Sequence, residues 1–115
     1  MTDLEELQAK LKVLSDAYAA QLPEKIRQIE QIWSDLPHDS FNEAGFATLH
    51  RMVHSLTGSG KTFGFSLLSD VARSLEEYIL DLAQAKTIPN EEQCEHIRLL
   101  LQKLLAAAVH SEVGN

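Results

Sequence analysis

The sequence is poor in cysteine, proline and glycine: its 115 residues include one cysteine, three prolines and five glycines. The lone Cys94 excludes an internal disulfide, and it lacks the Cys or His spacing of a zinc site. We therefore assign Cys94 only a packing role in a reducing compartment. With 44% apolar and 23% charged residues, the composition is that of a folded chain rather than a disordered one. Its length suits a single domain spanning residues 1–115.

Positive charge is scarce as well: ten Lys and Arg residues stand against 17 Asp and Glu residues, for a formal net charge of −7. Because no long basic run is present, phosphate backbones and anionic lipid surfaces would repel the chain, so we expect neither nucleic acid nor a membrane as a partner. No stretch approaches the roughly 18 apolar residues of a membrane span, and the acidic start MTDLEELQAK lacks the features of a signal peptide. We expect a cytoplasmic protein.

Strand-type alternation is also missing, whereas apolar residues recur every three or four positions from end to end, which predicts an all-α fold. The first expected helix covers residues 3–21, and a second helix or a kinked continuation runs from Pro23 to Trp33. A third helix starts after Ser40 or Asn42 and ends near Thr62. A fourth is capped by Ser66, and a last one is capped by Asn90. This layout predicts an antiparallel four-helix bundle with an additional N-terminal helical segment. We expect a monomer, because one bundle can bury all the apolar stripes.

The string GSGKT at residues 58–62 looks like the end of a nucleotide-binding P-loop. Such a loop needs G-x-x-x-x-G-K-[ST] between a buried strand and a helix, so that backbone N–H groups surround the phosphates. Here Ser55 stands in the place of the first glycine, and the preceding FATLHRMVH has the period of a helix. The sequence therefore argues against nucleotide binding.

The same segment has a distinctive surface when it is placed on a helix in steps of about 100° per residue. The apolar residues cluster on one side, whereas His54 points about 130° away from them, toward water. Gly58 lies one turn further along nearly the same line, followed by Lys61 and Phe65, with His50 one turn before. Because a glycine inside a helix costs roughly 1 kcal/mol relative to alanine, we expect Gly58 to serve the close approach of another protein's surface to His54, with Phe65 as a second docking residue on that face. Gly60 falls on the core side, where it lets a neighbouring helix come close.

This segment resembles the signature of histidine phosphotransfer (HPt) domains, H-x-L-K-G-x-x-x-x-x-G. His54, Leu56, Gly58 and Gly64 match it, and TFGF followed by LLSDVARSLEEYI is similar to the family's continuation into its next helix. The expected helices also fit the four-helix bundle of that family, so the resemblance covers essentially the whole chain.

One position departs from the family pattern. The lysine that follows the phosphorylated histidine by three residues is Thr57 here. Lys61 lies one helical turn beyond Thr57 on the same side, and its flexible stem could bring a positive charge back toward His54. We expect Lys61 to replace the missing lysine, with Thr57 and His50 completing the surroundings of the phosphoryl group. The alternative is that Lys61 is an ordinary solvated surface lysine with no role at the phosphoryl group.

The resemblance implies that His54 accepts a phosphoryl group from a phospho-aspartate on a response-regulator receiver domain and passes it to another receiver. The expected partners are therefore receiver domains and a hybrid histidine kinase. No cofactor is expected in this chain, since the receiver would supply Mg²⁺. His50 and His54 are spaced as a metal-binding pair would be, but no further ligand is evident, so we expect no metal. The chain would be a carrier without kinase activity of its own.

Two other functions remain open at this point. The first is the phospho-accepting domain of a chemotaxis-type histidine kinase, in which a kinase domain rather than a receiver phosphorylates the histidine. The short chain with its own starting Met favours an independent carrier over this alternative. The second is a helical adaptor that binds partners without phosphorylation, which would leave an exposed His54 and Gly58 unexplained.

Overall fold

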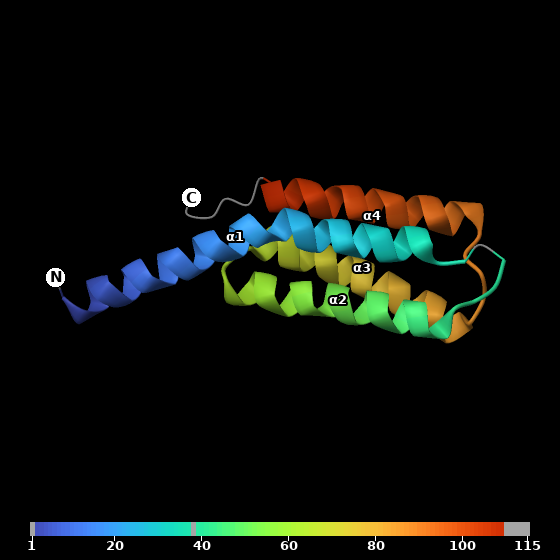
Figure 1. The fold of residues 1–115 in the computed structure, drawn as a ribbon, viewed down its shortest axis with the longest axis horizontal. Coiled ribbons are helices and arrows are strands. Elements are labelled where there is room, and N and C mark those ends of the chain that lie inside the picture. The colour runs from blue at the N-terminus through green and yellow to red at the C-terminus, as the bar shows by residue number, and fades with distance from the viewer. Residues whose placement is uncertain (1, 38, 110–115) are drawn as a thin grey trace.

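A computed structural model describes residues 2–37 and 39–109 and shows four α-helices (Figure 1). They are α1 (Asp3–Asp35), α2 (Glu43–Thr62), α3 (Ser66–Ala85) and α4 (Glu91–Val109). No strand occurs among the described residues. The helices contact one another in a ring, α1 with α2, α2 with α3, α3 with α4 and α4 with α1. The predicted all-α fold is therefore confirmed, and its arrangement is that of a four-helix bundle.

The core lies between the four helices and is built from the apolar residues that recur every three or four positions. Each helix contributes at least two side chains with less than 2% exposure, among them Leu22, Ile26, Ile29, Leu49, Val53, Leu68, Leu75, Ile79, Ile97 and Leu104. The α2–α3 pair has the most extensive contact of the four. This pair carries the candidate site described below.

Polar side chains mark most of the helix starts that the sequence predicts. Thr2 and Glu5 form a reciprocal capping box on α1, and Asn42 Oδ1 accepts from Gly45 N at the start of α2. Asn90 Oδ1 accepts from Gln93 N ahead of α4. The expected cap at Ser66 is wrong, because Ser66 is already helical and Phe65, which has no side-chain cap bond, precedes it.

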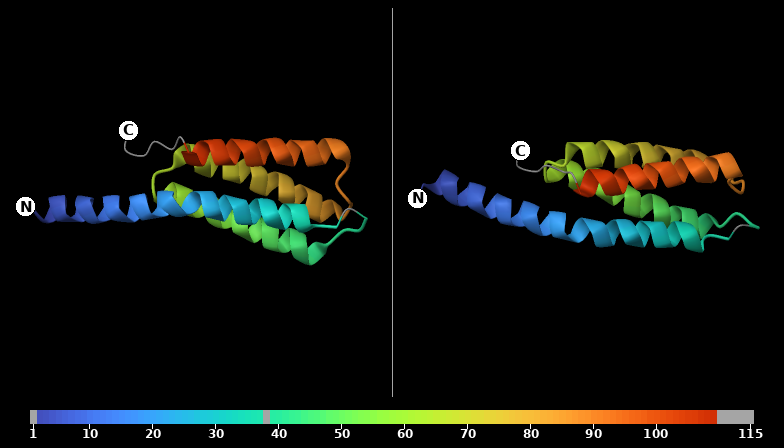
Figure 2. Two further views of the ribbon diagram at one scale, coloured as in Figure 1. Left: turned by 45° about the horizontal axis from the view of Figure 1, so that its top comes forward. Right: turned by 90° about the horizontal axis from the view of Figure 1, so that it is seen from above.

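The first 35 residues differ from the prediction. Pro23 lies inside one continuous helix, α1, and neither begins a second helix nor separates an additional N-terminal segment (Figure 2). A proline inside a helix costs about 3 kcal/mol because it removes one backbone hydrogen bond and crowds the preceding turn. The neighbours Leu22 and Ile26 are both 0% exposed. Burial of these side chains on either side of Pro23 offsets the cost and keeps the helix intact.

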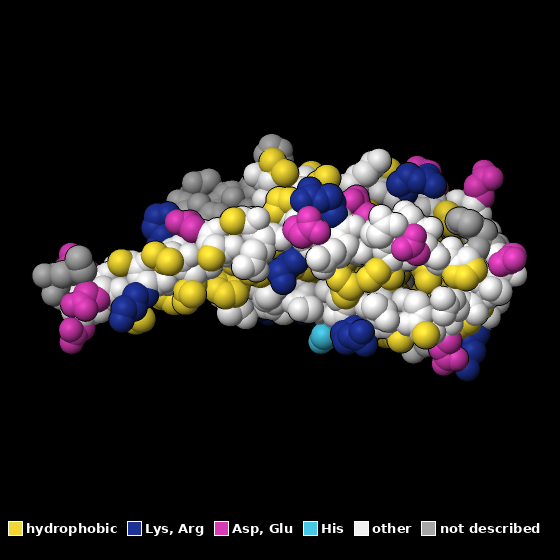
Figure 3. All heavy atoms as spheres, viewed as in Figure 1, with side chains coloured by type: hydrophobic (Ala, Val, Ile, Leu, Met, Phe, Trp, Pro, Cys, Tyr) yellow, Lys and Arg dark blue, Asp and Glu magenta, His cyan; other side chains and the backbone are white. Residues whose placement is uncertain are grey.

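The N-terminal half of α1 extends beyond the other helices, as Figure 1 shows. With 33 residues, α1 is 13 residues longer than α2 or α3, which have 20 each. Its leucines at positions 4, 7, 11 and 14 are 63%, 53%, 53% and 53% exposed, and hydrophobic side chains are visible along this projecting part in Figure 3. The expectation that one bundle buries every apolar stripe is therefore wrong, because α2 ends and α3 begins beside Tyr18, short of these residues. Among the described residues, none of the helices is both long and apolar enough to span a membrane.

Candidate functional site

His54 lies in the middle of α2 and points away from the core. Its side chain is 69% exposed, whereas the neighbouring Val53 and Leu56 are 0% and 2% exposed. The burial pattern thus agrees with the face that the sequence predicts for His54. The imidazole is presented to solvent from a rigid element rather than from a loop, which limits its freedom to reorient.

Glu76 of α3 holds this imidazole. His54 Nδ1 lies 2.6 Å from Glu76 Oε2, and the Glu76 side chain is only 16% exposed. An ionised carboxylate can only accept hydrogen bonds, so the proton of the ring must sit on Nδ1 in this contact. Nε2 is then left with a free lone pair. The arrangement therefore fixes the orientation of the ring and makes Nε2 the nucleophilic nitrogen.

Thr57 positions Glu76 rather than facing solvent. It is 7% exposed, and its hydroxyl lies 3.1 Å from Glu76 Oε1 and 3.2 Å from the Val53 carbonyl oxygen, to either of which it can donate. Its own carbonyl accepts a bond of 2.7 Å from the hydroxyl of Ser69 on α3. At the position where the family has a lysine, this chain thus has a buried, neutral side chain that joins α2 to α3.

His50 lies beside the site, one turn before His54. The two rings are 6.0 Å apart and nearly parallel, with 18° between their planes, and the His50 side chain is 30% exposed. His50 Nε2 is 3.4 Å from Glu76 Oε2, which is close enough for an ion pair but outside hydrogen-bond geometry. Within residues 2–37 and 39–109, no group of three or more His, Cys, Asp or Glu side chains is arranged to hold a metal ion.

The two glycines of α2 have opposite surroundings. A Cβ added at Gly58 would have no atom of another element within 4 Å, whereas one at Gly60 would meet Leu68 and Ser69 of α3 at 3.4 Å. Gly60 is buried where α3 passes close to α2, as the sequence predicts. Gly58 is exposed on open space, so nothing within the described chain requires a glycine there. Its role in docking remains a prediction.

Lys61 is exposed in the last turn of α2, seven residues after His54. Seven residues correspond to about 10 Å along the helix axis, and side chains on a helix lean toward its N-terminus. An extended lysine on this face thus points its ammonium toward His54. Its role at the phosphoryl group also remains a prediction.

Phe65 does not lie on the exposed face where the sequence analysis placed it. It is 2% exposed and packs edge-on against Tyr18, with the ring centroids 5.3 Å apart. The helical projection fails because α2 ends at Thr62 and Gly64 takes a positive φ of 84° that turns the chain into α3. Phe65 is therefore a core residue and is unavailable for docking.

Glu76 of α3 belongs to the site but was missed by sequence reasoning. Glu76 looked like one of several polar residues opposite an apolar stripe. However, Ser69, Ala72 and Glu76 follow one another at spacings of three and four, and the first two are small and buried. This line of small residues is a signal that α2 passes close to this side of α3. Arg73 is an exposed residue one turn before Glu76. Because Glu76 contacts Thr57 and Ser69 lies against Gly60, position 73 of α3 is level with the part of α2 between Thr57 and Gly60.

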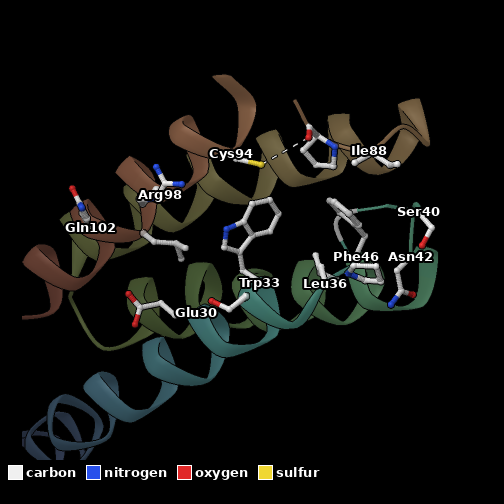
Figure 4. Close-up of a pocket in the computed structure, with 14 residues that line it drawn as sticks. Glu30, Trp33, Leu36, Ser40, Asn42, Phe46, Ile88, Cys94, Arg98 and Gln102 are labelled. Carbon is white, nitrogen blue, oxygen red and sulfur yellow. Dashed lines mark hydrogen bonds between the residues drawn. The ribbon is translucent and has the colours of Figure 1, made fainter. Parts of the chain in front are cut away.

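A separate cavity lies between the end of α1 and the start of α4 (Figure 4). It has a volume of about 620 Å³, and Trp33 points into it from α1 while Arg98 and Gln102 border it from α4. Cys94 lines the same cavity, with its thiol 3.8 Å from the Pro89 carbonyl oxygen. None of the residues around His54 lines this cavity, so it forms no part of the candidate site.

Comparison with known proteins supports an interpretation of the chain as a whole. The family model described as Hpt domain matches residues 2–107, which is nearly the full length. No curated protein and no solved structure matches the chain.

Proposed function

The chain belongs to the Hpt domain family, and from this membership and the geometry of His54 we propose that it is a phosphorelay carrier. Members of this family carry out histidine phosphotransfer in phosphorelays and interact with receiver domains and histidine kinases. We propose that His54 accepts the phosphoryl group from a receiver phospho-aspartate and passes it to another receiver aspartate. The observation that carries this proposal is an exposed imidazole whose Nδ1 is held by Glu76 at 2.6 Å.

The proposed step is a substitution at phosphorus. The lone pair of His54 Nε2 forms the N–P bond while the P–O bond to the receiver aspartate breaks, and the aspartate leaves as a carboxylate. The ring gains positive charge as Nε2 attacks, and the Glu76 carboxylate at Nδ1 stabilises that charge without removing the proton. In the reverse direction the carboxylate of the next receiver attacks phosphorus, and the N–P bond breaks. Neither direction needs a further base on this chain.

Phosphoryl transfer depends mainly on position and charge neutralisation. In this proposal the receiver domain supplies Mg²⁺, and the bundle supplies a fixed nucleophile together with the cations Lys61 and Arg73. Gly58 leaves the surface beside His54 low enough for the receiver to approach. The active site is thus completed only in the complex, and the chain acts as a single carrier domain over residues 1–115.

A labelling experiment tests the assignment of His54. The protein is incubated with a receiver domain that carries ³²P on its aspartate, and the label is tested for loss in acid and retention in alkali, as phosphohistidine requires. We expect label on the wild-type protein and none on His54→Gln. The matched control is His50→Gln, one turn away in the same helix, which should still be labelled. Label that survives His54→Gln would show that the site is wrong.

The same experiment separates the alternatives left by the sequence. Labelling by an isolated kinase domain with ATP, together with no labelling by any receiver, would identify the phospho-accepting domain of a chemotaxis-type kinase. If neither donor labels a folded protein that still binds receivers, the adaptor function is correct and the carrier function is wrong.

A further inference from the structure

The projecting half of α1 carries an apolar stripe that the bundle does not use. We name it the leucine stripe and define it as Leu4, Leu7, Leu11 and Leu14, all more than half exposed. The spacings of 3, 4 and 3 residues continue through Tyr18 and Leu22, which are buried in the core. The leucine stripe is therefore an extension of the same seam that packs against the other helices inside the bundle.

The spacing identifies the kind of partner. Apolar residues that alternate at three and four positions average 3.5 residues, which is the repeat of a seam that packs against one other helix by knobs into holes. A helix that packs on a broad surface carries a wider apolar face, with a further apolar residue at position e or g of the heptad. The other exposed faces of this segment carry polar residues, except for Val13 and alanines. The occupant of the leucine stripe is thus expected to be an amphipathic helix of about two heptads.

We propose that this helix is the same segment of a second copy of the chain, in antiparallel orientation. When residue 9 of one helix is level with residue 9 of the other, Leu4 lies opposite Leu14 and Leu7 opposite Leu11. All eight leucines then face leucines, and the contact ends where each bundle begins at Tyr18. A parallel pair is excluded by shape, because beyond Tyr18 the face that carries the seam is already covered by the chain's own helices.

The size and charge of the contact set its strength. A fully exposed leucine offers on the order of 100 Å² of apolar surface, so eight half-exposed leucines bury about 400 Å² between them. This is well below the roughly 1,200 Å² of stable complexes, so the dimer should be weak and reversible. Residues 2–17 contain four acidic and two basic residues, and the two copies therefore repel each other. Salt should strengthen the dimer by screening that repulsion.

Sedimentation equilibrium of the full chain, from about 5 to about 500 µM and at low and high salt, tests this proposal. We expect a monomer–dimer equilibrium that shifts toward the dimer at high salt. Leu11→Gln should weaken dimerisation at least tenfold, since it removes one leucine from each copy. The matched control is Val13→Gln, which replaces an even more exposed apolar residue of the same helix outside the leucine stripe and should leave the dimer intact. A monomer throughout, or a dimer that survives Leu11→Gln, would overturn the proposal.

Cross-linking tests the orientation in a Cys94→Ala background. Gln8→Cys lies near the twofold axis of the antiparallel pair and should form an intermolecular disulfide. Position 4 lies opposite position 4 of the other copy only in a parallel pair, so Leu4→Cys should form no intermolecular disulfide. The reverse result would refute the antiparallel arrangement. Phosphotransfer at monomeric concentrations provides a further check: if Leu11→Gln slows transfer from a receiver there, the leucine stripe binds the receiver and the assignment to a second copy is wrong.

Discussion

The contact between His54 and Glu76 leads to the sharpest prediction. Glu76→Gln keeps the size and shape of the side chain and removes its charge. The amide oxygen can still accept from His54 Nδ1, but the bond is then neutral rather than charge-assisted. The alternative amide orientation donates to Nδ1 and moves the ring proton to Nε2, which blocks the nucleophile. Either outcome slows phosphotransfer while leaving the bundle folded.

The expected size follows from the hydrogen bond itself. A bond to a charged group contributes about 1.5–3 kcal/mol, whereas a neutral one contributes about 0.5–1.5 kcal/mol. The contact is short, at 2.6 Å, and Glu76 is only 16% exposed, but His54 is 69% exposed, so solvent screening brings the difference toward the lower end of this range. A loss of about 1–1.5 kcal/mol from the transition state corresponds to roughly a tenfold slower transfer.

Rapid-quench kinetics with a ³²P-labelled receiver measures the transfer rate, and ¹⁵N spectra of the His54 ring report which nitrogen carries the proton. We expect Nδ1–H in the wild-type protein and a slower rate in Glu76→Gln. The control is Glu77→Gln, which removes the same charge from the adjacent, exposed position of α3. A rate within twofold of wild type in Glu76→Gln, or Nε2–H in the wild-type spectrum, would refute the role assigned to Glu76.

Three further predictions concern the surroundings of the site and its support. Gly58→Ala should raise the free energy of unfolding by about 0.5–1 kcal/mol and yet slow transfer; a stabilised variant with wild-type kinetics would remove the docking role. Lys61→Ala and Arg73→Ala should each slow transfer about two- to fivefold. The effect of each substitution should be smaller at high salt, because both cations are exposed and salt screens their charge. Unchanged transfer rates would make both ordinary surface residues. Burial raises the pKa of Tyr18 above 10.0, against the opposing effect of its 2.6 Å bond with Ser59. The folded state therefore holds that proton more tightly, and the stability it confers is lost as pH rises above about 10. Tyr18→Phe should cost about 1 kcal/mol at neutral pH and lessen this alkaline loss, as urea unfolding at several pH values would show.

The parts of the site that depend on one helix could be predicted from the sequence. Successive residues of a helix turn by about 100°, so the exposure of His54 and the burial of Gly60 follow from the positions of Val53 and Leu56 alone. Phe65 shows the limit of this reasoning. The projection holds only while the helix continues, and α2 ends at Thr62, after which the positive φ of Gly64 turns the chain just before Phe65.

The parts that depend on two helices could not be predicted in the same way. Glu76 reaches His54 only because α2 and α3 pack at one particular level, and a helical pattern does not contain that relative shift. The length of α1 is a similar case. Pro23 argues locally for a break, whereas the burial of Leu22 and Ile26 that overrides it exists only in the assembled bundle.

Thr57 connects the departure from the family pattern with the geometry of the site. A lysine at this buried position would place an ammonium group beside Glu76 Oε1 and would compete with His54 for the carboxylate. The threonine hydroxyl contacts that oxygen at 3.1 Å without neutralising it, so the full negative charge remains available to the imidazole. In the proposed transfer, the chain would thereby gain a better-supported nucleophile and lose a cation next to the phosphoryl group. That cation must then come from outside the buried pair, which is why the exposed Lys61 and Arg73, together with the receiver, are the residues on which the transfer rate should depend.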